Sequence, residues 1–202
     1  MAINLSKGQK ISLKKDNQKQ GLGEILVNLN WNSSPTKQGL LKSLFGGNSG
    51  IDLDLGCLYE LTDGSKGAVQ ALGNSFGSLN APPYVSLDGD DRTGASEAGE
   101  NLRINGDRVS EIKRILVYTF IYEGIANWQQ ADATVTIKYP GAEDIIVKMD
   151  TYNSSQIMCG LALFQNVNNE TFSVEKIVQF YQGHEALDRA FGWGMKWKPG
   201  KK

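Results

Sequence analysis

Soft metal ligands and the groups used in nucleophilic catalysis are scarce in this chain of 202 residues. It contains two cysteines and one histidine, whereas a zinc site needs three or four Cys or His ligands. A hydrolase that combines a nucleophile, a histidine and an acid would have to use His184, which is more simply explained as a polar residue at a helix start. The glycine-rich nucleotide-binding motifs are also missing. We therefore expect a protein that is not an enzyme.

Long apolar runs and an excess of one charge are missing as well. The 21 basic and 22 acidic residues leave a net charge of −1, so no global positive field attracts nucleic acid. There is no run of 18 apolar residues, and the first residues lack the apolar core of a signal peptide. We expect a cytoplasmic protein with no transmembrane segment and no nucleic-acid partner, in which Cys57 and Cys159 are buried free thiols.

What the chain does contain is short β-branched and aromatic runs separated by many of its 23 glycines. Such runs at regular spacing are typical of a sandwich of strands. The sequence predicts an all-β protein, a β-sandwich of two packed, mainly antiparallel sheets with a short C-terminal helix, forming a single domain over residues 1–202. The predicted strands cover residues 3–5, 11–13, 24–31, 51–62, 68–72, 114–123, 133–139, 144–149, 158–165 and 172–181.

Four segments carry more detailed predictions. Residues 3–5 and 11–13 alternate on either side of a Lys-Gly pair, which predicts an opening β-hairpin. Residues 114–123 are nearly all apolar, which is typical of a central strand covered on both faces. Residues 184–191 have helical spacing and end at Gly192. Residues 32–50 are predicted to be an inserted loop, whose apolar patch either packs back onto the sandwich or anchors a partner or membrane surface.

Carboxylates gather in two places. Asp52 and Asp54 alternate with apolar residues, so they share one face of a strand. Residues 88–100 hold five acidic residues and one arginine, interleaved with glycines. Calcium takes six to eight oxygen ligands, and glycines let a loop fold around the ion, so the two segments predict a calcium site. A solvated acidic loop is the alternative that the residues leave open. The spacing excludes an EF-hand, because Thr93 stands at the position of the turn glycine.

Two carboxylates are also the pair that a glycosidase uses as acid and base. Asp90 or Asp91 with Glu100 would have to form that pair in an aromatic cleft. Trp128, Trp193 and Trp197 are the aromatic residues available for it, but packing in the core explains tryptophans more often. This alternative therefore ranks well below a binding site.

The sequence resembles a known family, the TerD-domain stress proteins of bacterial tellurium resistance. The resemblance runs nearly from end to end, and within the family it is strongest for the TerA-like branch. The general motifs are Ile3-Asn-Leu-Ser-Lys-Gly, Leu29-Asn-Trp31, Asp52-Leu-Asp54-Leu, Gly89-Asp-Asp-Arg-Thr-Gly94, Gly99-Glu-Asn101 and Arg114-Ile-Leu-Val-Tyr-Thr-Phe. The branch motifs are Asp91-Arg-Thr-Gly-Ala-Ser, Phe120-Ile-Tyr-Glu-Gly, Asn168-Asn-Glu-Thr-Phe, Gly183-His-Glu-Ala and Gly192-Trp-Gly-Met.

The resemblance implies a β-sandwich that binds calcium through acidic loops at one end, with no established enzymatic activity. Together with the acidic pattern it gives a predicted set of calcium ligands. Two departures from the family pattern, Arg92 within the first motif and Asn101 in place of an acid, put one of the family's two sites in doubt. The predicted ligands are Asp52, Asp54, Asp90, Asp91, Glu97, Glu100 and Asn101.

The functional expectation follows from this resemblance. It is a calcium-binding stress-response protein associated with tellurite resistance, acting as a binding or scaffold module. Its expected partners are calcium and other proteins of the tellurium-resistance and stress-response system, with membrane-surface association through such a complex left open. The alternative is a calcium-independent ligand- or protein-interaction module that uses the acidic loops.

Overall fold

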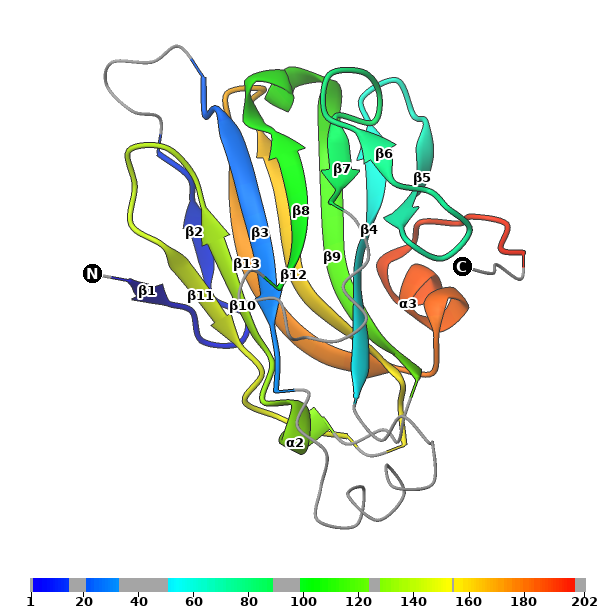
Figure 1. Cartoon of the computed structure of the whole chain (residues 1–202). Coiled ribbons are helices and arrows are strands. Elements are labelled where there is room, and N and C mark those ends of the chain that lie inside the picture. The colour runs from blue at the N-terminus through cyan, green and yellow to red at the C-terminus, as the bar shows by residue number, and fades with distance from the viewer. Residues whose placement is uncertain are drawn as a thin grey trace.

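The computed structural model describes residues 2–14, 21–32, 51–88, 99–123, 128–153 and 155–198. Two β-sheets lie face to face, with helix α3 (His184–Phe191) on the outer side of one of them (Figure 1). The predicted all-β sandwich is therefore confirmed. Most of the predicted insertion, residues 33–50, lies outside the described residues.

The first sheet has seven strands, and all its pairings are antiparallel except that of β1 with β11. In spatial order its strands are β1 (Ile3–Asn4), β11 (Ile145–Lys148), β10 (Thr134–Lys138), β3 (Glu24–Asn30), β8 (Glu100–Asn105), β7 (Val85–Leu87) and β6 (Gly77–Ser78).

The second sheet has six strands and is entirely antiparallel. In spatial order its strands are β2 (Lys10–Ser12), β13 (Thr171–Tyr181), β12 (Met158–Val167), β9 (Ile112–Glu123), β4 (Asp52–Leu61) and β5 (Lys66–Gln70). Two short helical segments complete the described chain, the 3-10 helix η1 (Gly106–Glu111) and helix α2 (Trp128–Ala131).

The main core lies between the two sheets. Every second residue of a strand points into this core: Ile25, Val27 and Leu29 of β3 are fully buried, and the residues between them face outward. A second, smaller apolar cluster covers the outer face of the six-stranded sheet, where Leu187 of α3 and Trp193 pack on it. The six-stranded sheet is therefore covered on both faces.

Strand β9 shows how a continuous apolar run serves these two layers. Ile115 and Val117 point into the main core, whereas Leu116, Tyr118 and Phe120 belong to the outer cluster. β9 lies between β12 and β4 in its sheet. The predicted central strand covered on both faces is confirmed.

Helix α3 begins and ends at the predicted residues. Gly192 follows it with a φ of 62° and donates its N–H to the carbonyls of Arg189 and Asp188, so glycine ends the helix by adopting a left-handed conformation. Among the described residues, no helix is both long and apolar enough to cross a bilayer.

The predicted opening hairpin is wrong. β1 pairs in parallel with β11, whereas β2 pairs with β13 of the other sheet. A tight turn, in which Gln9 N–H donates to the Ser6 carbonyl at 2.9 Å, carries the chain from one sheet to the other. Leu5 and Leu13 thereby fill the main core from opposite sheets. The alternating pattern is the same in both arrangements, because it fixes the buried face of a strand and not its partner.

Candidate functional site

Asp52 and Asp54 lie in the first half of β4 and share a face, as predicted. Leu53 and Leu55 alternate with them and fill the core between the sheets. The two aspartates are nonetheless shielded from solvent, with Asp52 only 6% exposed and Asp54 fully buried. β4 thus carries two carboxylates in positions where proteins rarely keep a charge.

Glu100 contacts the backbone of β4 from the opposite sheet, next to the core-facing Leu55, whereas Asp52 and Asp54 alternate with the core-facing leucines. Glu100 begins β8, is 1% exposed, and its Oε2 accepts a hydrogen bond of 2.5 Å from the N–H of Leu55, the residue after Asp54. The preceding Gly99 has a φ of 60°, and a Cβ there would lie 2.2 Å from the carbonyl oxygen of Leu29. A glycine at this position therefore lets the start of β8 lie tight against β3.

A buried hydroxyl lies at the same level of the sandwich. Thr119 is the register partner of Leu55 on β9 and is fully buried. Its Oγ1 has no hydrogen-bond partner among the described residues. An oxygen donor in such a position is suited to a hard cation or to water.

The other predicted ligands fall into two groups. Asn101 points to the opposite face of β8 from Glu100, where its Oδ1 accepts a 2.8 Å hydrogen bond from the side-chain amide of Asn28. The structure therefore does not bring Asn101 together with Glu100. The remaining three predicted ligands, Asp90, Asp91 and Glu97, lie outside the described residues.

The described carboxylates alone do not complete a metal site. Within the described ranges, no group of three or more His, Cys, Asp or Glu side chains is placed to hold a metal ion. The donor types nevertheless fit a hard cation, because carboxylate and hydroxyl oxygens suit calcium and both thiols are buried in the main core. A calcium ion takes six to eight oxygen ligands, more than the described carboxylates supply.

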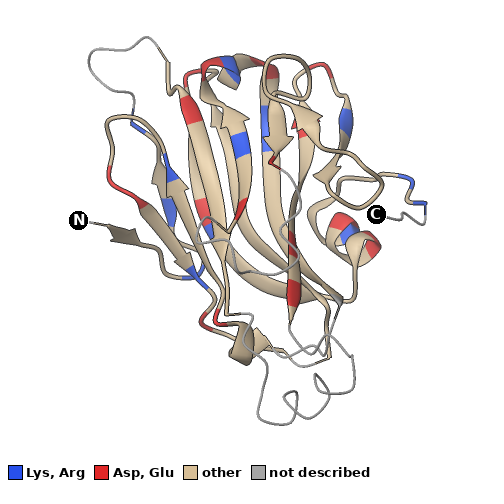
Figure 2. Cartoon of the chain, in the orientation of Figure 1, with Lys and Arg blue, Asp and Glu red and all other residues tan. Residues whose placement is uncertain are grey.

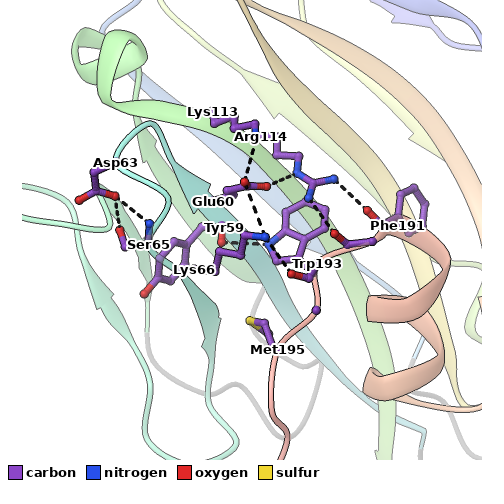
Figure 3. Close-up of polar contacts among 12 residues, drawn as sticks. Tyr59, Glu60, Asp63, Ser65, Lys66, Lys113, Arg114, Phe191, Trp193 and Met195 are labelled. Atoms are coloured by element: carbon purple, nitrogen blue, oxygen red, sulfur yellow. Dashed lines mark hydrogen bonds and ion pairs between the residues drawn. The ribbon is translucent and has the colours of Figure 1, made fainter.

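A different group of charges organises the outer face of the six-stranded sheet, and Figure 3 shows it. Glu60, 4% exposed, receives three cations: Lys113 Nζ at 2.8 Å, Arg114 Nε at 2.6 Å and Lys66 Nζ at 3.7 Å. Burial alone raises the pKa of Glu60, but the hydrogen bonds and charges of Lys113 and Arg114 outweigh it, so the pKa lies below its ordinary value. Glu60 is therefore ionised at neutral pH and is the common partner of the three cations.

Arg114 links Glu60 to residues 192–198, which we call the C-terminal strap. It donates to the carbonyl of Phe191 at 2.9 Å and lies 3.7 Å above the ring centroid of Trp193 (Figure 3). Lys66 Nζ donates to the Trp193 carbonyl, and the indole N–H of Trp193 donates to the Tyr59 carbonyl. These contacts hold the strap to the sheet.

Asp188 of α3 holds the rest of the strap. One carboxylate oxygen accepts the N–H of Gly194 at 2.7 Å, and the other accepts the N–H of Met195 and the indole N–H of Trp197, both at 2.9 Å. Asp188 is 4% exposed. Its charge is thus satisfied by three donors from the strap.

The only histidine belongs to an aromatic network beneath the strap. The Tyr118 hydroxyl donates to Oε1 of Gln70 at 2.6 Å, and Nε2 of His184 lies 2.9 Å from the same oxygen. The His184 ring packs edge-on against Tyr118 and Phe120 and lies 4.9 Å from the ring of Trp197. Burial lowers the pKa of His184 to about 4, so the ring is neutral at pH 7. Sequence reasoning found His184 at the helix start but missed this network.

Strand β4 makes room for this network at a glycine. A Cβ on Gly56 would lie 2.8 Å from the ring of Tyr118. Burial raises the pKa of Tyr118 well above its ordinary value, and negative charge on Cys57 and Asp54 raises it further. Tyr118 is therefore a neutral phenol that links the region of Asp54 to Gln70.

Fold and site together define a β-sandwich protein with buried carboxylates that suit a hard cation. The chain belongs to the TerD domain family, whose model matches residues 1–138. It is 43% identical over 96% of its length to the tellurium resistance protein TerA of Alcaligenes sp., and 30% identical over 61% of its length to TerX of Serratia marcescens. The chain spans 58% and 64% of the lengths of these two relatives.

Solved structures agree on the fold. A protein of unknown function, SAV2460, superposes with a TM-score of 0.61 at 14% identity, covering 87% of this chain and 99% of that one. A homologue of the telluride resistance protein TerD from Streptomyces coelicolor, SCO6318, gives a TM-score of 0.56 at 17% identity, covering 83% of this chain and 95% of that one. At these identities the likeness concerns the fold.

Proposed function

We propose that this chain is a calcium-binding module of a tellurite-resistance system and acts in a cytoplasmic stress-response assembly as a binding or scaffold component rather than as a catalyst. The association with tellurite resistance is supported by family membership and by the relatives named as tellurium resistance proteins. Calcium and other proteins of the same system are its proposed partners.

One observation carries the calcium proposal. Glu100 reaches across from the seven-stranded sheet to the N–H of Leu55, the residue after Asp54, and the carboxylates of Glu100 and Asp54 are both almost fully shielded from solvent. Ionised carboxylates in such positions are costly unless opposite charge compensates them. A divalent cation would supply that charge, with Asp52, Asp54 and Glu100 as ligands from the described residues. Asp90, Asp91 and Glu97 are the proposed ligands from the adjoining acidic segment.

The role as a binding or scaffold module is supported by the state of the reactive groups. His184 is half-buried and neutral, with Nε2 at hydrogen-bond distance from Gln70. Burial raises the pKa of the Cys57 thiol to about 12 and also raises that of Cys159, so neither thiol is activated at neutral pH. Direct thiol chemistry with tellurite would need an exposed, ionised cysteine.

Thermal unfolding tests the calcium proposal. The purified chain is unfolded in excess EGTA, in millimolar calcium and in millimolar magnesium. A ligand at about 100 times its Kd adds about 2.7 kcal/mol to the free energy of unfolding. For a chain of this length that corresponds to a rise in Tm of roughly 5 to 11 °C.

We expect this rise with calcium and little with magnesium, which prefers rigid octahedral sites and keeps its waters. Asp54→Asn should remove most of it. Asp144→Asn, at an exposed acid whose carboxylate is 3.7 Å from Lys138, is the matched control and should keep it. An equal Tm in EGTA and calcium would contradict the proposal and favour a calcium-independent interaction module.

A further inference from the structure

A pocket of about 730 Å³ opens on the outer face of the six-stranded sheet. Its walls come from three parts of the chain that are distant in sequence: the end of β5 with the turn after it, helix α3, and the C-terminal strap. Figure 1 shows α3 on this side of the molecule, near β5. The volume lies within the range of small-molecule sites, which is roughly 300 to 1,000 Å³.

The back wall of the pocket is held in place by the aromatic network. Gln70, 7% exposed, is fixed by Tyr118 and His184 through its Oε1, and the ring of Trp197 packs against that of His184. The Trp197 indole is fixed in turn by its hydrogen bond to Asp188. The wall is therefore built before any ligand arrives, which lowers the entropic cost of binding.

The charged groups of the lining favour an anion. Arg189 and Lys198 both line the pocket and are exposed, and neither makes an ion pair with any described residue. Glu185 is the one acidic residue of the lining. Asp188, one residue before Arg189, makes no ion pair with it and instead accepts hydrogen bonds from three donors of the strap.

The start of α3 adds to this preference. The helix begins at His184 in the pocket wall, and its N-cap residue Gly183 has no side chain to accept from the first N–H groups. These N–H groups and the helix dipole attract negative charge. The strap residues that carry positive charge lie on the same side of the molecule, as Figure 2 shows.

We propose that this pocket binds a small organic anion, with its carboxylate or phosphate group held by Arg189 and Lys198 and its apolar part against Trp197. The pocket uses none of the proposed calcium ligands, but Tyr118 connects the region of Asp54 to Gln70 in its wall. Anion binding is therefore measured without calcium.

Isothermal titration calorimetry of the full chain in EGTA tests the proposal. Three probes are titrated: AMP, which joins a phosphate to a flat ring; benzoate, which joins a carboxylate to a flat ring; and inorganic phosphate, which has no apolar part. We expect saturable 1:1 binding of AMP or benzoate, tighter than that of inorganic phosphate. The preferred probe tells a phosphate ligand from a carboxylate ligand.

Variants of the lining residues test whether the ligand binds in this pocket. Arg189→Gln and Lys198→Gln should each weaken binding about tenfold, since a hydrogen bond to a charged group is worth about that factor. Lys196→Gln is the matched control, because Lys196 lies on the same strap and lines only the adjoining pocket, whereas Trp197 and Lys198 line both. Circular dichroism and an unchanged Tm verify that each variant is folded.

One further variant distinguishes binding of an anion from binding of a zwitterion, because it changes the affinity in opposite directions for the two. Glu185→Gln removes the only acidic group of the lining, so it should tighten binding of an anion. Weaker binding in Glu185→Gln would indicate that the site takes a positive group and would overturn the proposal. The absence of saturable binding for all three probes, or an equal loss in Lys196→Gln and Lys198→Gln, would overturn it as well.

Discussion

Replacing Glu60 by glutamine tests how the outer face of the six-stranded sheet is held together. The change keeps the size of the side chain and removes only the charge that Lys113, Arg114 and Lys66 share. Arg114 would keep its contacts with the Phe191 carbonyl and the Trp193 ring but lose its carboxylate partner.

The magnitude follows from the exposure of the three cations. The side chains of Lys113 and Lys66 are 59% and 32% exposed, so each contributes at most about 1 kcal/mol. The Arg114 side chain is 21% exposed and its hydrogen bond to Glu60 is nearly buried, which is worth about 1.5 to 3 kcal/mol. Because glutamine keeps one acceptor oxygen, we expect Glu60→Gln to cost about 2 to 3 kcal/mol of unfolding free energy.

The stabilisation that the Glu60 charge contributes should decrease in acid. The pKa of Glu60 lies below its ordinary value of 4.5, because the hydrogen bonds and charges of its partners outweigh the effect of burial. A depressed native pKa stabilises the fold fully above about pH 4.5, and this contribution is lost as the pH falls through the native pKa. The difference between the wild-type chain and Glu60→Gln should therefore be constant from pH 7 to 5 and shrink in stronger acid.

Urea unfolding followed by circular dichroism measures this difference at each pH. Glu175→Gln is the control, since Glu175 makes a single ion pair of 3.0 Å with the exposed Lys10 and should cost less than about 1 kcal/mol. A loss in Glu60→Gln no larger than that of the control, or a difference that stays constant down to pH 3, would refute the reasoning.

Three more predictions concern the network under the strap and the core. Gly56→Ala should cost about 1 to 3 kcal/mol in urea unfolding, because the new Cβ would lie 2.8 Å from the Tyr118 ring; a neutral result would show that the ring moves freely. NMR titration of His184, the only histidine, should give a pKa near 4, and a value of 6 or above would mean that the ring is solvated. Cys57 and Cys159 should resist iodoacetamide at pH 8 in the folded chain and react in urea, whereas fast labelling of the native chain would contradict their burial.

Local patterns predicted the elements whose partners lie nearby in sequence. The strands β10, β11, β12 and β13 and helix α3 all follow from alternation or helical spacing together with adjacent turn residues, and neighbouring strands in these two pairs bond to each other. The central position of β9 followed from its continuous apolar run, since only a strand covered on both faces needs one. Burial of Trp128 and Trp193 is confirmed too.

Contacts between distant residues were beyond the reach of these patterns. The opening strands were predicted as a hairpin because alternation does not specify the neighbouring strand, and the true partners lie more than 140 residues away. Glu60 and Arg114 are 54 residues apart, and Gln70 and His184 are 114 apart. β8 was not predicted as a strand, in part because its outward-facing residues are polar: Asn101 and Arg103 alternate with Leu102 and Ile104.

The candidate site was predicted in part for the same reason. The shared face of Asp52 and Asp54 follows from strand periodicity alone. The approach of Glu100 to Leu55 joins two sheets and depends on the packing of the sandwich. The acidic pattern and the family resemblance both named Glu100 as a ligand, but neither predicted this contact. The opposite orientation of Asn101 follows from β8 being a strand rather than the predicted loop.

Equilibrium dialysis with radioactive calcium tests the central claim most directly, because it counts bound ions without relying on a change in stability. We predict at least one saturable calcium ion per chain, retained in Asp144→Asn and lost or weakened at least tenfold in Asp54→Asn and in Glu100→Gln. No saturable calcium in the wild-type chain, or equal binding in all of these variants, would contradict the account.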